Sequence, residues 1–86
     1  MNPIQIDPEE KFKVVAYLPS SLGSRFIVQQ ISAPDKYALL MLPSFDIIDF
    51  VDKDFVGAAL VKRDFKSFPE ELSFSYKDRE QVFSEL

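Results

Sequence analysis

The spacing of apolar and polar residues divides the N-terminal half of the chain into three short segments of strand character. In residues 11–18, every second residue is apolar and the residues between them are half polar, and a proline follows this segment. The pattern is typical of a strand with one side near solvent. Residues 25–31 and 37–42 are also rich in β-branched, aromatic and aliphatic residues, and short loops separate the three segments. They predict an antiparallel meander. The apolar face of the first segment consists of Phe12, Val14, Ala16 and Leu18.

The stretch from residue 37 to residue 61 is the most apolar part of the chain, and we expect the rest to pack against it. Residues 37–42 are apolar on both faces. Such a segment fits a central strand that is covered on both sides, or on one side with a partner on the other.

An acidic pattern follows this strand. Aspartate recurs every three positions, at Asp46, Asp49 and Asp52. A period of three is nearer to that of a helix than to that of a strand, and a serine suited to N-capping precedes the pattern. We therefore predict a helix over residues 44–54. Residues 55–62 fit either a continuation of that helix or a fourth strand, and we favour the strand.

The last third of the chain is expected to hold a loop, a strand and a short helix. Residues 65–70 have the composition of a loop or a single turn, and residues 72–76 alternate as a strand does. Residues 78–86 open with the spacing of a capping box, which predicts a helix. Its inward residues would be Val82, Phe83 and Leu86.

The N-terminal residues differ in character from the rest. Residues 1–10 carry two prolines, three acids and two isolated isoleucines, Ile4 and Ile6, so we expect an extended arm pinned by those side chains. Residues 11–86 then form a single domain. The predicted fold class is α+β, a small antiparallel sheet of three to five strands with one or two helices packed on one face.

Composition adds that the chain can build a core but has few reactive side chains. Of 86 residues, 47% are hydrophobic and nine are phenylalanine, and each buried aromatic ring removes about 150–250 Å² from water. The chain has no cysteine and no histidine. Disulfide and thiolate chemistry are therefore excluded, and the commonest metal ligand is missing.

The charge balance and the apolar runs bear on partners and location. Ten basic and fourteen acidic residues give a net charge of −4, which opposes direct binding to nucleic acid and suits a basic partner. The N-terminus lacks the basic start and apolar core of a signal peptide. The longest uncharged run, residues 14–24, is about half the length of a membrane helix. We expect a soluble cytoplasmic protein with no membrane partner.

The aspartates around residues 46–54 are the most concentrated acidic feature, and they allow two interpretations. Carboxylates suit hard divalent cations, but their spacing does not match a calcium loop. A solvated helix face is therefore favoured. The serines lack a histidine that could activate them as nucleophiles. We expect no metal, no cofactor and no enzymatic activity.

A basic cluster with aromatic neighbours gives the candidate partner-binding residues. Residues 62–66 contain three of the ten basic residues, and aromatic rings lie in and just after this cluster. Interface anchors are enriched in aromatic residues and arginine, which points to Arg63, Phe65 and Phe68. The alternative is that the two rings close the end of the sheet.

These observations favour a non-enzymatic protein-interaction module, such as a regulator, an inhibitor or an accessory subunit that binds another protein. One alternative is an acidic nucleic-acid mimic that blocks a DNA- or RNA-binding protein. A carboxylate-based metal-dependent hydrolase is a further alternative. Self-association into a homo-oligomer is also open.

Overall fold

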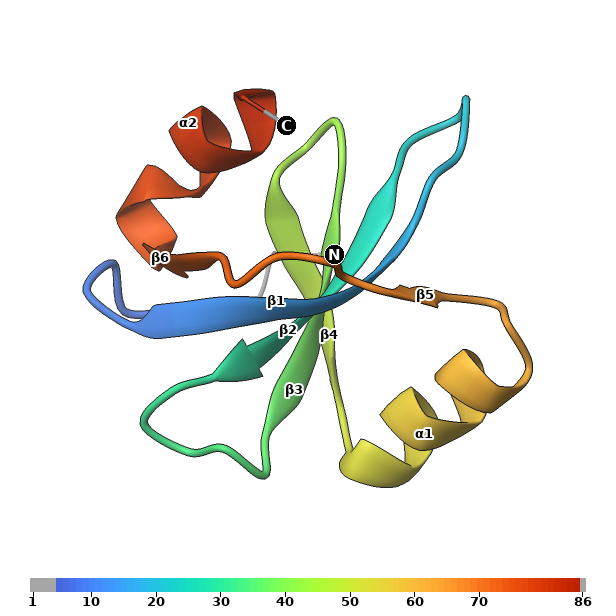
Figure 1. Ribbon diagram of the computed structural model, residues 1–86. Helices are drawn as coiled ribbons and strands as arrows, with labels where there is room; N and C mark the ends of the chain where they lie inside the picture. Colours follow the sequence, from blue (N-terminus) through green and yellow to red (C-terminus); the bar gives the residue numbers. More distant parts are fainter. Residues whose placement is uncertain (1–4, 86) are drawn as a thin grey trace.

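The computed structural model describes residues 5–85, which form an antiparallel sheet of six strands with two short α-helices (Figure 1). The α+β class is confirmed, and the sheet is larger than the three to five strands expected. Strands β4, β3, β2, β1 and β5 lie side by side in that order, and β6 also pairs with β1. The elements are β1 (Lys11–Leu18), β2 (Arg25–Gln30), β3 (Tyr37–Met41), β4 (Asp46–Val51), α1 (Lys53–Val61), β5 (Lys66–Ser67), β6 (Ser73–Ser75), a 3₁₀ turn (Tyr76–Asp78) and α2 (Arg79–Ser84).

The first three strands form the predicted meander. β1 pairs with β2 and β2 pairs with β3, each antiparallel. β3 lies between β2 and β4, and its Ala38 and Leu40 are fully buried. On the other face, Tyr37 and Leu39 are partly buried against a separate hydrophobic cluster, so both faces of this segment are covered.

The prediction of a helix over residues 44–54 is wrong, because residues 46–51 form β4. Isoleucine, phenylalanine and valine dominate this segment, and such residues favour strands. A β-bulge at Ile48 hides the strand in the sequence: Leu40 pairs with Ile47, but Leu39 pairs with Asp49. The extra residue breaks the alternation by which a strand is usually identified.

The favoured strand over residues 55–62 is also wrong, because this segment belongs to α1. Asp52 ends β4 and caps the helix, since its Oδ1 accepts a hydrogen bond from the Phe55 backbone N–H at 2.8 Å. An N-cap aspartate of this kind satisfies one of the amides that open a helix. The two alanines and the leucine that follow favour a helix, whereas the glycine at position 57 weakens it.

The C-terminal third confirms one predicted strand and one predicted helix. Strand β6 and helix α2 lie where the sequence places them, although the Asp78 side chain makes no capping hydrogen bond. The predicted loop at residues 65–70 contains β5, which pairs with the second half of β1. Leu86 and Ile4 lie outside the described residues.

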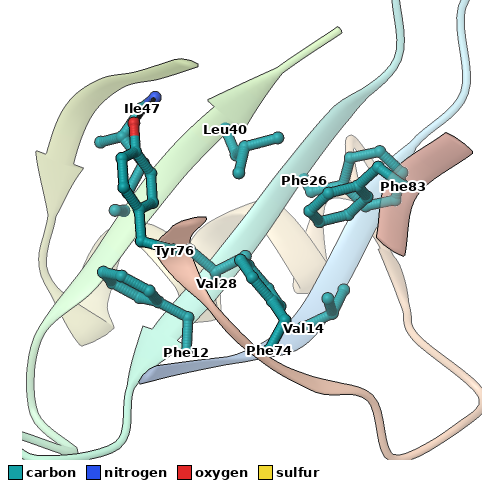
Figure 2. Close-up of a cluster of buried hydrophobic side chains, with 10 residues drawn as sticks. Phe12, Val14, Phe26, Val28, Leu40, Ile47, Phe74, Tyr76 and Phe83 are labelled. Carbon is teal, nitrogen blue, oxygen red and sulfur yellow. Dashed lines mark hydrogen bonds between the residues drawn. The ribbon is translucent and has the colours of Figure 1, made fainter. Parts of the chain in front are cut away.

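Buried side chains form two clusters. A second bulge, in β1, makes the buried residues before it face one cluster and the buried residue after it face the other. Val14 pairs with Val28, but Ala16 pairs with Ile27, so the predicted common face of β1 changes side between them. The first cluster includes Phe83 of α2 and the second includes Val56 of α1, so the two helices serve different clusters. The first cluster (Figure 2) contains Phe12, Val14, Phe26, Val28, Ala38, Leu40, Ile47, Phe74, Tyr76 and Phe83. The second contains Ala16, Ile27, Val56, Ala59 and Phe65.

The described part of the N-terminal segment is tied to the C-terminal part of the chain. The backbone N–H of Tyr76 donates to the Glu10 carbonyl at 2.8 Å, and that of Lys77 donates to the Pro8 carbonyl at 3.0 Å. The Lys77 ammonium also pairs with Glu9 at 2.8 Å. Ile6 packs against the first cluster.

Candidate interaction surface

The two phenylalanines proposed from the sequence as partner contacts pack against hydrophobic clusters. Phe65 is only 7% exposed and lies in the second cluster with Val56 and Ala59. Phe68 is half-buried, and its ring meets the Tyr17 ring edge-on at 5.8 Å between centroids. Both rings therefore have a structural role, which leaves Phe65 little surface for a partner.

Arg63 is exposed, and it lies just after helix α1, where its backbone conformation stops the helix from continuing. Its φ of 62° lies in the left-handed region. The N–H of Arg63 donates to the Leu60 carbonyl, and the N–H of Asp64 donates to the Ala59 carbonyl. This pair of bonds is the Schellman arrangement, which commonly terminates a helix. A partner contact at Arg63, Phe65 and Phe68 stays a prediction.

Exposed apolar side chains gather elsewhere, along β4 and the start of α1. Among the described residues, six large hydrophobic side chains are exposed, and three of them lie between residues 48 and 55. They are Ile48, Phe50 and Phe55. The same stretch holds Asp49, Asp52 and Asp54, so it combines apolar and acidic groups.

A pocket of about 520 Å³ lies at the end of β4, and we call it the edge pocket. The turn between β2 and β3 supplies one side, and the end of β4 with the N-cap of α1 supplies the other. The lining combines two aromatic rings, one valine, two carboxylates, one lysine and one glutamine. These residues are Gln30, Asp35, Lys36, Tyr37, Phe50, Val51 and Asp52.

Hydrogen bonds hold the walls of the edge pocket in place. The Gln30 N–H donates to the Lys36 carbonyl at 3.0 Å, which closes the β2–β3 turn. The Gln29 side-chain amide crosses the same turn and donates to the Pro34 carbonyl at 2.6 Å. On the opposite wall, Asp52 is fixed by its capping bond to α1. Both walls are therefore held by hydrogen bonds within this chain.

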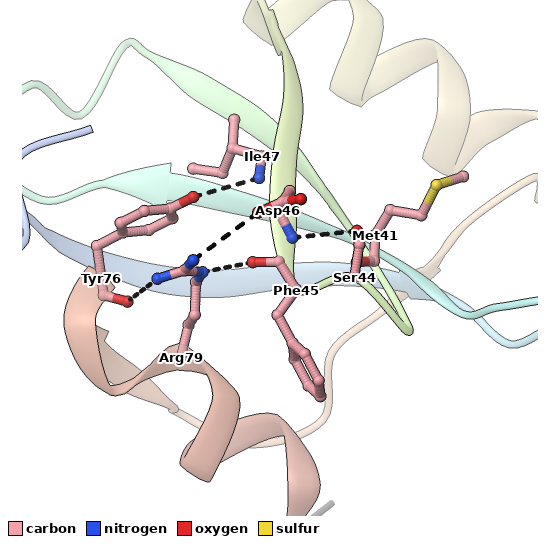
Figure 3. Close-up of polar contacts among 7 residues, drawn as sticks. All are labelled: Met41, Ser44, Phe45, Asp46, Ile47, Tyr76 and Arg79. Atoms are coloured by element: carbon pink, nitrogen blue, oxygen red, sulfur yellow. Dashed lines mark hydrogen bonds and ion pairs between the residues drawn. The ribbon is translucent and has the colours of Figure 1, made fainter. Parts of the chain in front are cut away.

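The backbone of β4 is protected against addition of another strand. β4 lies at one end of the strand order, and its Phe50 N–H donates to the Asp49 side chain at 2.9 Å. The Ile47 N–H points to the Tyr76 hydroxyl at 3.5 Å (Figure 3). A bulge, charged side chains and backbone N–H groups that already have hydrogen-bond partners all hinder pairing with a further strand. Contacts at this edge would therefore use side chains.

Arg79 ties the start of α2 to the start of β4 (Figure 3). Its guanidinium donates to the Phe45 carbonyl and, at 3.0 Å, to the Tyr76 carbonyl, and it lies 3.9 Å from the Tyr76 ring centroid. It also approaches the Asp46 carboxylate at 3.8 Å. Asp46 thus has a cation of its own chain beside it, whereas Asp35 and Asp52 line the edge pocket.

The four aspartates do not share the helix face that their spacing predicted. Asp46 and Asp49 lie on β4, Asp52 caps α1 and Asp54 lies in its first turn. Among residues 5–85, no three acidic side chains are grouped closely enough to hold a metal ion. Within the same range, no helix has the length and apolar character needed to cross a membrane.

The sequence did not reveal the edge pocket. Its two walls are about fifteen residues apart in the chain and meet because Tyr37 pairs with Val51 across β3 and β4. A helix over residues 44–54, as the sequence predicts, excludes that pairing. The sequence indicates only one wall of the pocket, because Asp35 and Lys36 follow a proline in the short loop between residues 31 and 37.

Comparison with protein-family models, curated proteins and solved structures gives no match to this chain, so any function must be inferred from the chemistry of its own surface.

Proposed function

We propose that this protein is a small non-enzymatic interaction module that binds a basic segment of another protein at the edge pocket. The observation that carries the proposal is the combination of Tyr37 and Phe50 with the carboxylates of Asp35 and Asp52 in one pocket. Aromatic rings can accept the aliphatic stem and the cationic head of arginine or lysine, and carboxylates pair with the head.

Charge supports a basic ligand over an acidic one. Two carboxylates and the Lys36 ammonium leave a charge of −1 in the pocket lining at neutral pH, and the whole chain carries −4. Both fields attract a cationic segment and speed its encounter. The ligand should therefore carry at least one arginine or lysine.

The neighbouring surface indicates what else the segment should carry. Phe50 lines the pocket and is partly exposed, and Ile48 is exposed two residues before it on β4. Interfaces commonly surround a charged or aromatic anchor with apolar contacts. We therefore expect apolar residues near the basic anchor of the partner, which contacts β4 through side chains.

Selection of peptides from a random display library on the folded protein tests this proposal. The expected outcome is enrichment of peptides that combine arginine or lysine with apolar residues. Selected peptides should bind the Asp35→Asn, Asp52→Asn double variant at least about tenfold more weakly, because both carboxylate charges are gone. Asparagine at position 52 keeps an N-cap oxygen, so α1 should stay folded.

A matched control separates the pocket from general charge attraction. Glu70 and Glu80 are exposed and lie outside the pocket lining, and Glu70→Gln with Glu80→Gln removes the same net charge. This control should bind the peptides nearly as well as the unmodified protein. Enriched peptides without basic residues, or equal losses in the two double variants, would overturn the proposal.

A further inference from the structure

Helix α1 presents apolar residues on its outer side as well as on its inner side. Seven of its nine residues are apolar or glycine, yet only Val56 and Ala59 are buried. Val61 is 83% exposed, and Gly57 and Ala58 are also exposed. A helix that is apolar on all sides is usually covered on all sides. Figure 1 shows α1 at the periphery of the sheet.

Glycine at position 57 has no steric explanation within the described part of the chain. A Cβ atom built there meets no heavy atom within 4 Å. Glycine in a helix interior is destabilising relative to alanine, because it loses more backbone freedom on folding. Together with Ala58 it leaves the middle of the outer side low and flat, which allows another helix to approach closely.

The charges at the two ends of α1 are opposite in sign. Asp52 and Asp54 lie at its N-terminal end, and Lys62 and Arg63 follow its C-terminal end. All four are exposed. An antiparallel copy of the same helix would place each acidic end beside a basic end, and the two helix dipoles would also oppose one another favourably.

We propose that the outer side of α1 binds the same surface of a second copy of this chain, with the two helices antiparallel about a two-fold axis. The helices cross at Gly57 and Ala58, and Val61 of each copy packs near the first turn of the other. Asp54 pairs with Lys62 across the contact at both ends. An interface of this symmetry uses one patch twice, which self-complementary charges make possible.

The size of the helix sets the strength of the dimer. Nine residues of α-helix span about 13 Å, and a stable interface usually buries about 800 Å² on each partner. One face of a helix of this length covers a smaller area than that. We therefore expect a weak dimer that forms between micromolar and millimolar concentration.

Sedimentation velocity over that concentration range tests the proposal. The unmodified protein should shift from monomer toward dimer as concentration rises. Ala58→Glu should weaken dimerisation at least about tenfold, because it places two like charges at the crossing point. Gln81→Glu puts the same charge on the exposed side of α2 and should leave dimerisation unchanged.

Charge exchange across the contact gives a second, independent readout. Asp54→Lys and Lys62→Glu should each weaken the dimer, and the two changes together should restore it, because the pairing is re-formed with the signs reversed. Circular dichroism checks that every variant keeps its fold. A monomer at all concentrations, a dimer unaffected by Ala58→Glu, or a double variant no better than the single ones would overturn the proposal. Asp54, Ala58 and Lys62 do not line the edge pocket, so peptide binding there is measured separately.

Discussion

Phe65 illustrates how a single residue can look like a surface anchor in the sequence and belong to the core in the fold. It follows the basic cluster and lies in a segment without clear periodicity. The Schellman turn after α1 reverses the chain, and the Phe65 N–H donates to the Ala59 carbonyl at 3.2 Å. This turn carries the ring back against Val56 and Ala59.

We therefore predict that Phe65→Ala destabilises the protein by about 3–5 kcal/mol, as is usual for removal of a buried aromatic ring. Arg63→Ala should change the free energy of unfolding by less than about 0.5 kcal/mol. The Arg63 side chain is exposed, and alanine would have to adopt the same left-handed backbone conformation, at a similar cost. Urea denaturation measures both. A loss below about 1 kcal/mol for Phe65→Ala would show that the ring is not a core residue.

At the scale of elements, Asp52 separates β4 from α1. Its backbone is extended, with φ −94° and ψ 175°, while its side chain accepts the bond that opens the helix. One residue thus ends the strand and starts the helix. Asp46, Asp49 and Asp52 are spaced by three for unrelated reasons, because the first two lie on an edge strand and the third is a cap.

We predict that Asp52→Ala costs about 0.5–2 kcal/mol of stability, the usual cost of losing an N-cap side chain. Asp52→Asn should keep most of that stability, because its amide oxygen can accept the same bond from Phe55. Thermal or urea denaturation of the two variants provides the comparison. Equal losses in both would mean that the charge matters and the capping bond does not.

At the scale of the whole molecule, Glu10 joins the N-terminal segment to the end of β2 and the loop that follows it. Its Oε1 accepts hydrogen bonds from the Ser32 hydroxyl and, at 2.8 Å, from the Gln30 side-chain amide. The Ser32 bond and then the Gln30 bond lower the pKa of this carboxyl below its ordinary value of 4.5. Gln30 also lines the edge pocket, so this contact supports one wall.

The lowered pKa of Glu10 fixes the direction of a pH effect. A carboxyl with a lower pKa in the folded state contributes stability above its ordinary pKa, and that stability is lost as pH falls through the folded value. Stability should therefore decline below about pH 4.5 in part through Glu10. Glu10→Gln should lower the urea midpoint at neutral pH, and the difference from the unmodified protein should shrink on acidification. A difference that stays constant with pH would contradict this assignment.

Elements whose structure depends on neighbouring residues in the chain could be predicted from the sequence, and features that depend on the pairing of distant segments could not. The first three strands, β6 and α2 were predictable, because alternation, β-branched residues and breaking prolines act within a few residues. The bulges at Val15 and Ile48 were not, because a bulge is defined by the register of two strands. The pocket residues Tyr37, Phe50 and Asp52 depend on that register as well.

The sequence by itself determined the α+β class, the meander of β1 to β3 and the lack of cysteine and histidine chemistry. The residue types of residues 46–51 allow a strand, and the tertiary structure decided it, because pairing with β3 buries Ile47 against Leu40. It also made a strand of two residues, β5, which exists through its pairing with β1. Local preferences act between neighbours in the chain, whereas strand pairing and burial depend on partners that only folding brings together.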